Sequence, residues 1–76
     1  MRRKELVIEV AERTDLRRET VERVLQGFAT VAAEALLEGQ DVPLGWDLGK
    51  LIVLKKKGLK VYFKPSRAFK EARDNK

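Results

Sequence analysis

The fold is decided by the stretch "LIVLKKKGLKVYFKPSRAFK", residues 51–70, in which two apolar segments flank a run of lysines. In the second segment, Val61 and Phe63 share one side of an extended strand, and the other side carries Lys60, Tyr62 and Lys64. Between the segments, Gly58 accepts the positive φ that a short hairpin loop requires. The stretch therefore predicts a β-hairpin with its tip at residues 56–58.

The segments beside the hairpin complete a sheet and add a final helix. Pro65 ends the returning strand because it has no backbone N–H, and Ser66 is a favourable cap for a short helix that follows. Before the hairpin, residues 40–54 are rich in Pro, Gly and β-favouring residues. This composition predicts a short edge strand at residues 42–44 and a longer strand from Leu48.

Two amphipathic helices precede the sheet. Residues 3–13 carry apolar side chains at helical spacing, and Asp15 after them tolerates the left-handed conformation that often ends a helix. A second apolar face runs from Val21 to Leu36 and stops at Gly39. The predicted order is ααβββα, an α+β fold.

Length and composition bound the kind of protein. A chain of 76 residues is one small domain that buries a thin core when alone, so a partner subunit would help it. With 43% hydrophobic and 38% charged residues, it is too apolar for a disordered tail and too charged for a membrane span. No secretory segment is recognisable, so we expect a soluble cytoplasmic protein. The sequence has no cysteine and no histidine, and it predicts no metal site, no cofactor, no small-molecule substrate and no enzyme.

The charges are unevenly distributed along the chain. Residues 1–47 hold seven Lys and Arg against ten Asp and Glu, whereas residues 48–76 hold ten against two. A net charge of +5 can be explained by solubility as well as by anion binding. The separation of acidic and basic residues along the chain, however, indicates one face that binds anions.

A helix-turn-helix pattern is present at "VAERTDLRRETVERVL", residues 10–25. In that interpretation residues 17–23 would enter a major groove. Glu19 and Glu22 would then face phosphates of the same sign, and the apolar helix continues to Leu37, so a helical hairpin packed on the core is favoured.

Four local strings together resemble the HU and integration host factor family of bacterial DNA-binding proteins. They are "KELVIEVAERTDL" (residues 4–16), "EALLEGQDVPL" (34–44), "LGKLIV" (48–53) and "VYFKPSRAFKEA" (61–72). In the last, residues 63–68 repeat the family's Phe-Lys-Pro-Gly-Lys-Ala string, with Ser for Gly and Arg for Lys. The resemblance implies an intertwined homodimer with a helical base, a β-saddle and two arms that grip the minor groove of DNA.

The resemblance also assigns parts to the chain, which we expect to be a single domain over residues 1–76. Residues 1–39 would form the helical dimerisation part, residues 40–64 the sheet with a shortened hairpin, and residues 65–76 the C-terminal helix. The dimer interface is expected at Phe28, Ala32, Leu36, Trp46, Phe63 and Phe69.

Three departures from the family pattern bear on function. The arm is truncated at residues 56–58 and has no tip proline, so strong kinking of DNA is not expected. Asp47 places a carboxylate in the turn where the family has a glycine-rich string. Ile52 and Leu54 fall on the concave face, where either neighbouring loops or the partner subunit cover them or they form a protein-partner face.

The expected DNA contacts are basic residues on the hairpin and the helix beside it, with one at the N-terminus: Lys55, Lys56, Lys57, Lys60, Lys64, Arg67, Lys70 and Arg3. Lysines suit phosphates better than base edges, although tip lysines also protect exposed β-edges from aggregation. Tyr62 either stacks on a sugar or base, or packs with its hydroxyl in water.

The sequence thus favours a homodimer that binds double-stranded DNA in the nucleoid without sequence preference and with little kinking. The alternative is a module of the same fold that has lost DNA binding and contacts another protein. Affinity, preference for DNA structure, RNA binding, the process served and homo- or heterodimerisation are not decided by the sequence.

Overall fold

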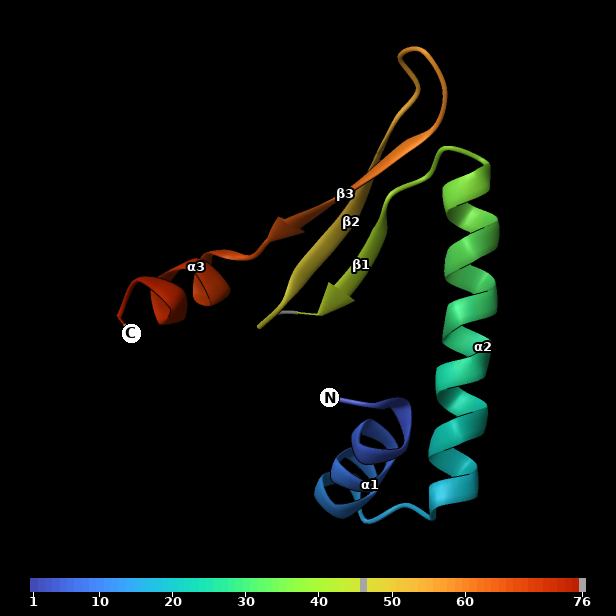
Figure 1. Ribbon diagram of the computed structural model, residues 1–76, viewed down its shortest axis with the longest axis vertical. Helices are drawn as coiled ribbons and strands as arrows, with labels where there is room; N and C mark the ends of the chain where they lie inside the picture. The colour runs from blue at the N-terminus through green and yellow to red at the C-terminus, as the bar shows by residue number, and fades with distance from the viewer. Residues whose placement is uncertain (46, 76) are drawn as a thin grey trace. The chain divides into compact units, whose positions relative to one another are not determined.

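The computed structural model describes residues 1–45 and 47–75. The elements are α1 (Arg3–Thr14), α2 (Arg18–Leu37), β1 (Val42–Gly45), β2 (Gly49–Leu54), β3 (Lys60–Pro65) and α3 (Arg67–Asp74), as Figure 1 shows. This order confirms the predicted ααβββα arrangement. The chain forms two compact units, Met1–Val31 and Ala32–Lys76, which share the long helix α2.

The first unit is held by a small apolar cluster between α1 and the start of α2. Val7, Ala11 and Val21 are buried there, and Val10 and Leu25 pack against them. α1 ends at Asp15, whose φ of 57° and ψ of 30° are left-handed, as predicted. The turn between α1 and α2 therefore begins at a residue type that tolerates the left-handed backbone conformation.

The end of α2 belongs to the second unit and is closed by a Schellman motif. Gly39 takes a φ of 81°, its N–H donates to the Leu36 carbonyl at 3.0 Å, and the Gln40 N–H donates to the Ala35 carbonyl at 2.9 Å. The side chain of Lys55 lies where a Cβ of Gly39 would stand. Glycine is therefore favoured here by its conformation, because the flexible end of the Lys55 side chain could move aside for a Cβ.

The second unit contains an antiparallel sheet of order β1-β2-β3. Its register pairs Lys50 with Lys64, Ile52 with Tyr62 and Leu54 with Lys60. Because side chains alternate along a strand, these six residues share one side of the sheet, which we call the basic face. The opposite, apolar face carries Val42, Leu51, Val53, Val61 and Phe63.

β2 and β3 are joined by a short loop of residues 55–59. Lys57 and Gly58 turn the chain with φ values of 54° and 107°. The tip therefore lies where the sequence predicted it, and the hairpin carries no long arm beyond the sheet (Figure 1).

α3 begins directly after the sheet. The Ser66 hydroxyl accepts a hydrogen bond from the Phe69 N–H at 3.1 Å, which confirms the predicted cap. The Ser66 N–H donates to the Leu48 carbonyl at 3.0 Å, and the rings of Phe63 and Phe69 meet edge to face at 5.8 Å. α3 is therefore tied to the sheet at its first turn.

The single chain leaves much apolar surface in water. On α2, Phe28 is 45% exposed and Val31 is 65% exposed, while on the sheet Phe63 is 44% exposed. Among the described residues, five apolar side chains are buried: Val7, Ala11, Val21, Ala32 and Val42. A chain with so thin a core gains stability when a partner covers these side chains.

Candidate nucleic-acid interface

One end of the basic face forms a hollow of about 1100 Å³, which lies between the sheet and the start of α3. Three of its lining residues are apolar, Pro43, Leu44 and Pro65, and we call them the floor. Four are basic, Lys50, Lys64, Arg67 and Lys70, and we call them the cationic rim. All of these residues belong to the second compact unit, so the hollow is built within one body.

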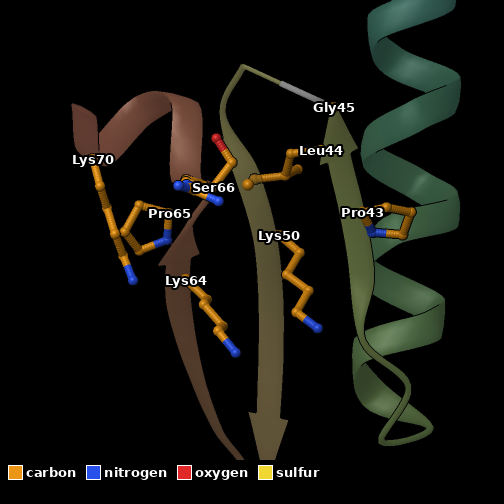
Figure 2. Close-up of a pocket in the computed structure, with 10 residues that line it drawn as sticks. Pro43, Leu44, Gly45, Lys50, Lys64, Pro65, Ser66 and Lys70 are labelled. Carbon is orange, nitrogen blue, oxygen red and sulfur yellow. The ribbon is translucent and has the colours of Figure 1, made fainter. Parts of the chain in front are cut away.

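The rim brings like charges together. Lys50 and Lys64 are direct cross-strand partners, and such pairs have Cβ atoms about 4.5–5.5 Å apart. Figure 2 shows the side chains of Lys50, Lys64 and Lys70 extending in the same direction from β2, β3 and α3. Like charges directly opposite each other destabilise a sheet, and a bound anion would relieve that repulsion.

The fourth rim cation has a partner in its own helix. Nε of Arg67 lies 3.1 Å from a carboxylate oxygen of Glu71, and the two side chains are 93% and 64% exposed. Exposed pairs of this kind contribute about 0–1 kcal/mol, so Arg67 can exchange Glu71 for a phosphate at little cost. The lysines of the rim form no ion pair among the residues described.

The other predicted lysines form a second group around the hairpin. Lys60 lies at the far end of β3, about 13 Å along the strand from Lys64. Lys55, Lys56 and Lys57 occupy the loop, and Lys55 is held against Gly39. The basic face therefore has a cation cluster at each end.

Apolar residues lie between the two clusters, as the alternation predicted. Ile52 is half-buried, and its neighbour Tyr62 is 45% exposed. Leu54 is 46% exposed opposite Lys60. The roles expected for these side chains, a partner face for Ile52 and Leu54 and stacking for Tyr62, stay predictions.

Arg3 lies in the other compact unit. It lines a hollow there with Glu19, Glu22, Arg23 and Gln26, so its surroundings carry both signs of charge. Its assignment to DNA stays a prediction, and the mixed surroundings make it the least favourable of the proposed phosphate contacts.

The predicted dimer residues are found in different surroundings. Ala32 is buried in its own chain, Leu36 is half-buried and Phe28 is 45% exposed. Phe63 and Phe69 contact each other. Trp46 lies outside the described residues. The interface as a whole stays a prediction.

Of the ten residues that line the hollow, only Lys64, Arg67 and Lys70 were among the predicted contacts; the absent ones include Lys50, Pro43 and Leu44. Lys50 was placed on the concave face but not among the DNA contacts, although it is the cross-strand neighbour of Lys64. Pro43 is the cross-strand partner of Lys50, and the position of Leu44 depends on a shift of register between Pro43 and Gly45. Alternation identifies the face of Lys50, but no local sequence pattern gives the shift.

Within residues 1–45 and 47–75, no group of three or more acidic side chains is arranged to hold a metal ion. In the same part of the chain, no helix combines the length and the apolar character needed to cross a membrane.

Comparison with known proteins supplies an independent view. A family model described as bacterial DNA-binding protein matches residues 1–60. A solved structure of a mutant HU from Thermotoga maritima matches with a TM-score of 0.83 and 29% identity, over 96% of this chain and 99% of that one. A structure of HU from Thermotoga maritima matches with a TM-score of 0.79 and 29% identity, over 96% and 98% of the chains. No curated protein matched the sequence.

Proposed function

Because the chain belongs to the HU-like family of bacterial DNA-binding proteins, we propose that it binds double-stranded DNA through phosphate contacts and without sequence preference. Members of this family are structural DNA-binding proteins and not enzymes. The observation that carries the proposal is the cross-strand pair of Lys50 and Lys64 on the rim of the hollow. Lysine is a hydrated point charge that suits phosphates and reads base edges poorly, hence the expected lack of sequence preference.

The binding form is a homodimer. Exposed apolar side chains on α2 and on the apolar face of the sheet support this, since a second copy would remove them from water. We expect such a dimer to be localised in the cytoplasm, at the bacterial nucleoid, where the DNA is found.

The dimer coats or weakly bends DNA. Minor-groove proteins that kink DNA insert an apolar wedge between base steps, and the family's arms carry theirs on a long hairpin. Here the hairpin loop is residues 55–59 and contains no proline. A duplex carrying a fluorophore at each end should therefore show little change in end-to-end distance when the protein binds.

The main test is a salt titration of binding to a fluorescent duplex of about 30 base pairs between about 50 and 200 mM salt. With about six to ten phosphates engaged per dimer, the slope of log K against log salt should be about −5 to −9. The double variant Lys50→Gln/Lys64→Gln removes four cations per dimer and should make that slope shallower by about 3 to 4.

A matched control is Arg13→Gln/Arg17→Gln, which makes the same charge change on exposed residues of the other unit. This variant should alter the slope by less than about 1. If a folded dimer fails to bind at low salt, or if both double variants act alike, the proposed interface is wrong.

A second function, contact with another protein, is favoured by one observation. The middle of the basic face is apolar, with Leu54 46% and Tyr62 45% exposed. Contact through phosphates alone would leave this strip in water. Replacement of Leu54 by Gln separates the two functions, because DNA binding through phosphates should not change.

A further inference from the structure

The hollow combines basic and apolar side chains, and binding of a phosphate would involve only the basic ones. Its rim carries four cations, while its floor is formed by two prolines and a leucine. Among the described residues, none of those that line it is acidic. Its volume of about 1100 Å³ lies slightly above the range of about 300–1,000 Å³ that ligand pockets show. A single anion would leave most of this space to water.

We propose that the hollow binds a short acidic peptide segment of a partner protein. One apolar side chain of the segment would lie on the floor, and carboxylates on either side of it would meet the rim lysines. The inference goes beyond DNA binding and does not depend on it.

Charge and shape together favour this occupant. The rim attracts carboxylates as well as phosphates, but a phosphodiester backbone offers no apolar side chain to cover Leu44 and Pro65. A peptide supplies both kinds of group on adjacent residues. Carboxylates placed between Lys50 and Lys64 would also relieve their repulsion across the sheet.

One glycine beside the floor fits a peptide as well. Gly45 lines the hollow, and among the described residues no atom outside its chain neighbours lies within 4 Å of where its Cβ would stand. Backbone without side chains is where another chain can approach closely and exchange hydrogen bonds. An extended segment is therefore accommodated beside the turn between β1 and β2.

The test uses the full chain and a fluorescein-labelled octapeptide with three glutamates, Phe-Leu and three more glutamates, followed by fluorescence anisotropy. Two control peptides replace Phe-Leu by Gly-Gly, or all glutamates by glutamines. The first peptide should bind at least about tenfold more tightly than either control, because only it satisfies both the floor and the rim.

Variants of the protein locate the site. Leu44→Ala removes part of the floor and should weaken the peptide about five- to tenfold. Lys70→Gln removes one rim cation from an exposed helix position, where it leaves the core intact, and should weaken the peptide by a similar factor. The matched control Lys56→Gln/Lys57→Gln, on the hairpin tip, should leave peptide binding within about twofold and weaken DNA binding.

Three results would overturn the inference. The Gly-Gly peptide could bind as tightly as the first, which would make the hollow a general polyanion surface. Both Leu44→Ala and Lys70→Gln could leave peptide binding unchanged. The protein could sediment as a species larger than a dimer and take no peptide, which would mean that another copy of the chain fills the hollow. DNA binding without peptide binding would leave the proposed function intact, and the reverse would leave this inference intact.

Discussion

Replacement of Gly49 by alanine should destabilise the protein more than the same change at Gly45. Gly49 opens β2 opposite Pro65 and has a φ of 136°. A Cβ there would overlap the carbonyl oxygen of Lys64 and lie 2.8 Å from Cα of Pro65 and 2.9 Å from the amide nitrogen of Ser66. All three are backbone atoms, and the Ser66 N–H is held by the Leu48 carbonyl, so none can move aside without disturbing the sheet.

Two separate costs make up the expected effect. A non-glycine residue held at a φ near 130° costs about 1–3 kcal/mol. Overpacking against atoms that cannot move adds about 1–3 kcal/mol. Gly45 supplies the control, because its φ of 130° imposes the first cost while the space around its Cβ position is open. Gly49→Ala should therefore lower the free energy of unfolding by about 1–3 kcal/mol more than Gly45→Ala does.

The assay is urea unfolding followed by circular dichroism. Protein concentration must be equal for all variants, because dimer formation makes the apparent stability depend on concentration. If the two alanine variants differ by less than about 0.5 kcal/mol, the backbone contact between β2 and the end of β3 has been misjudged.

Three other changes test separate features. Lys64→Gln should raise the free energy of unfolding by a few tenths to about 1 kcal/mol, because it removes the repulsion from Lys50. The same change should weaken DNA binding in a duplex titration. A lower free energy of unfolding in urea would contradict this account. Ser66→Ala should cost about 1 kcal/mol in urea unfolding by removing the α3 cap, and Ser66→Asp should retain most of it; equal losses would mean that the hydroxyl does not matter. Phe28→Asp should convert the dimer to monomer in sedimentation experiments, whereas Thr30→Asp on the same helix should not, and an intact Phe28→Asp dimer would move the interface elsewhere.

The fold could be predicted from sequence because its boundaries are set by local chemistry. Asp15 marks the end of α1 by its tolerance of a left-handed backbone, and Ser66 marks the start of α3 by its hydroxyl. The alternation of residues 60–64 gave the two faces of β3 correctly. Each of these signals acts within a few residues, so no knowledge of distant contacts was needed.

The site could be predicted only in part, since it depends on contacts between strands. Alternation placed Lys50 on the correct face, but its pairing with Lys64 follows from the register of β2 and β3. The floor at Leu44 depends on the irregular pairing after Pro43, which carries no local signal. Arg3, assigned to DNA as a basic residue at the N-terminus, lies beside acidic residues of α2, a placement that only the packing of two helices decides.

Three features that are unfavourable for a β-sheet lie close together around the hollow in the second unit. Gly49 carries a positive φ and a backbone contact too close for any side chain, Lys50 faces Lys64 across the strands, and Leu44 lies in an open hollow beside them. Each feature costs stability or order when considered alone. A small domain in which five of the described apolar residues are buried has little stability to spare, so several such costs need a compensating stabilisation. Natural proteins tolerate such conflicts chiefly at functional sites, and binding of an anionic partner is the gain that would offset all three at once.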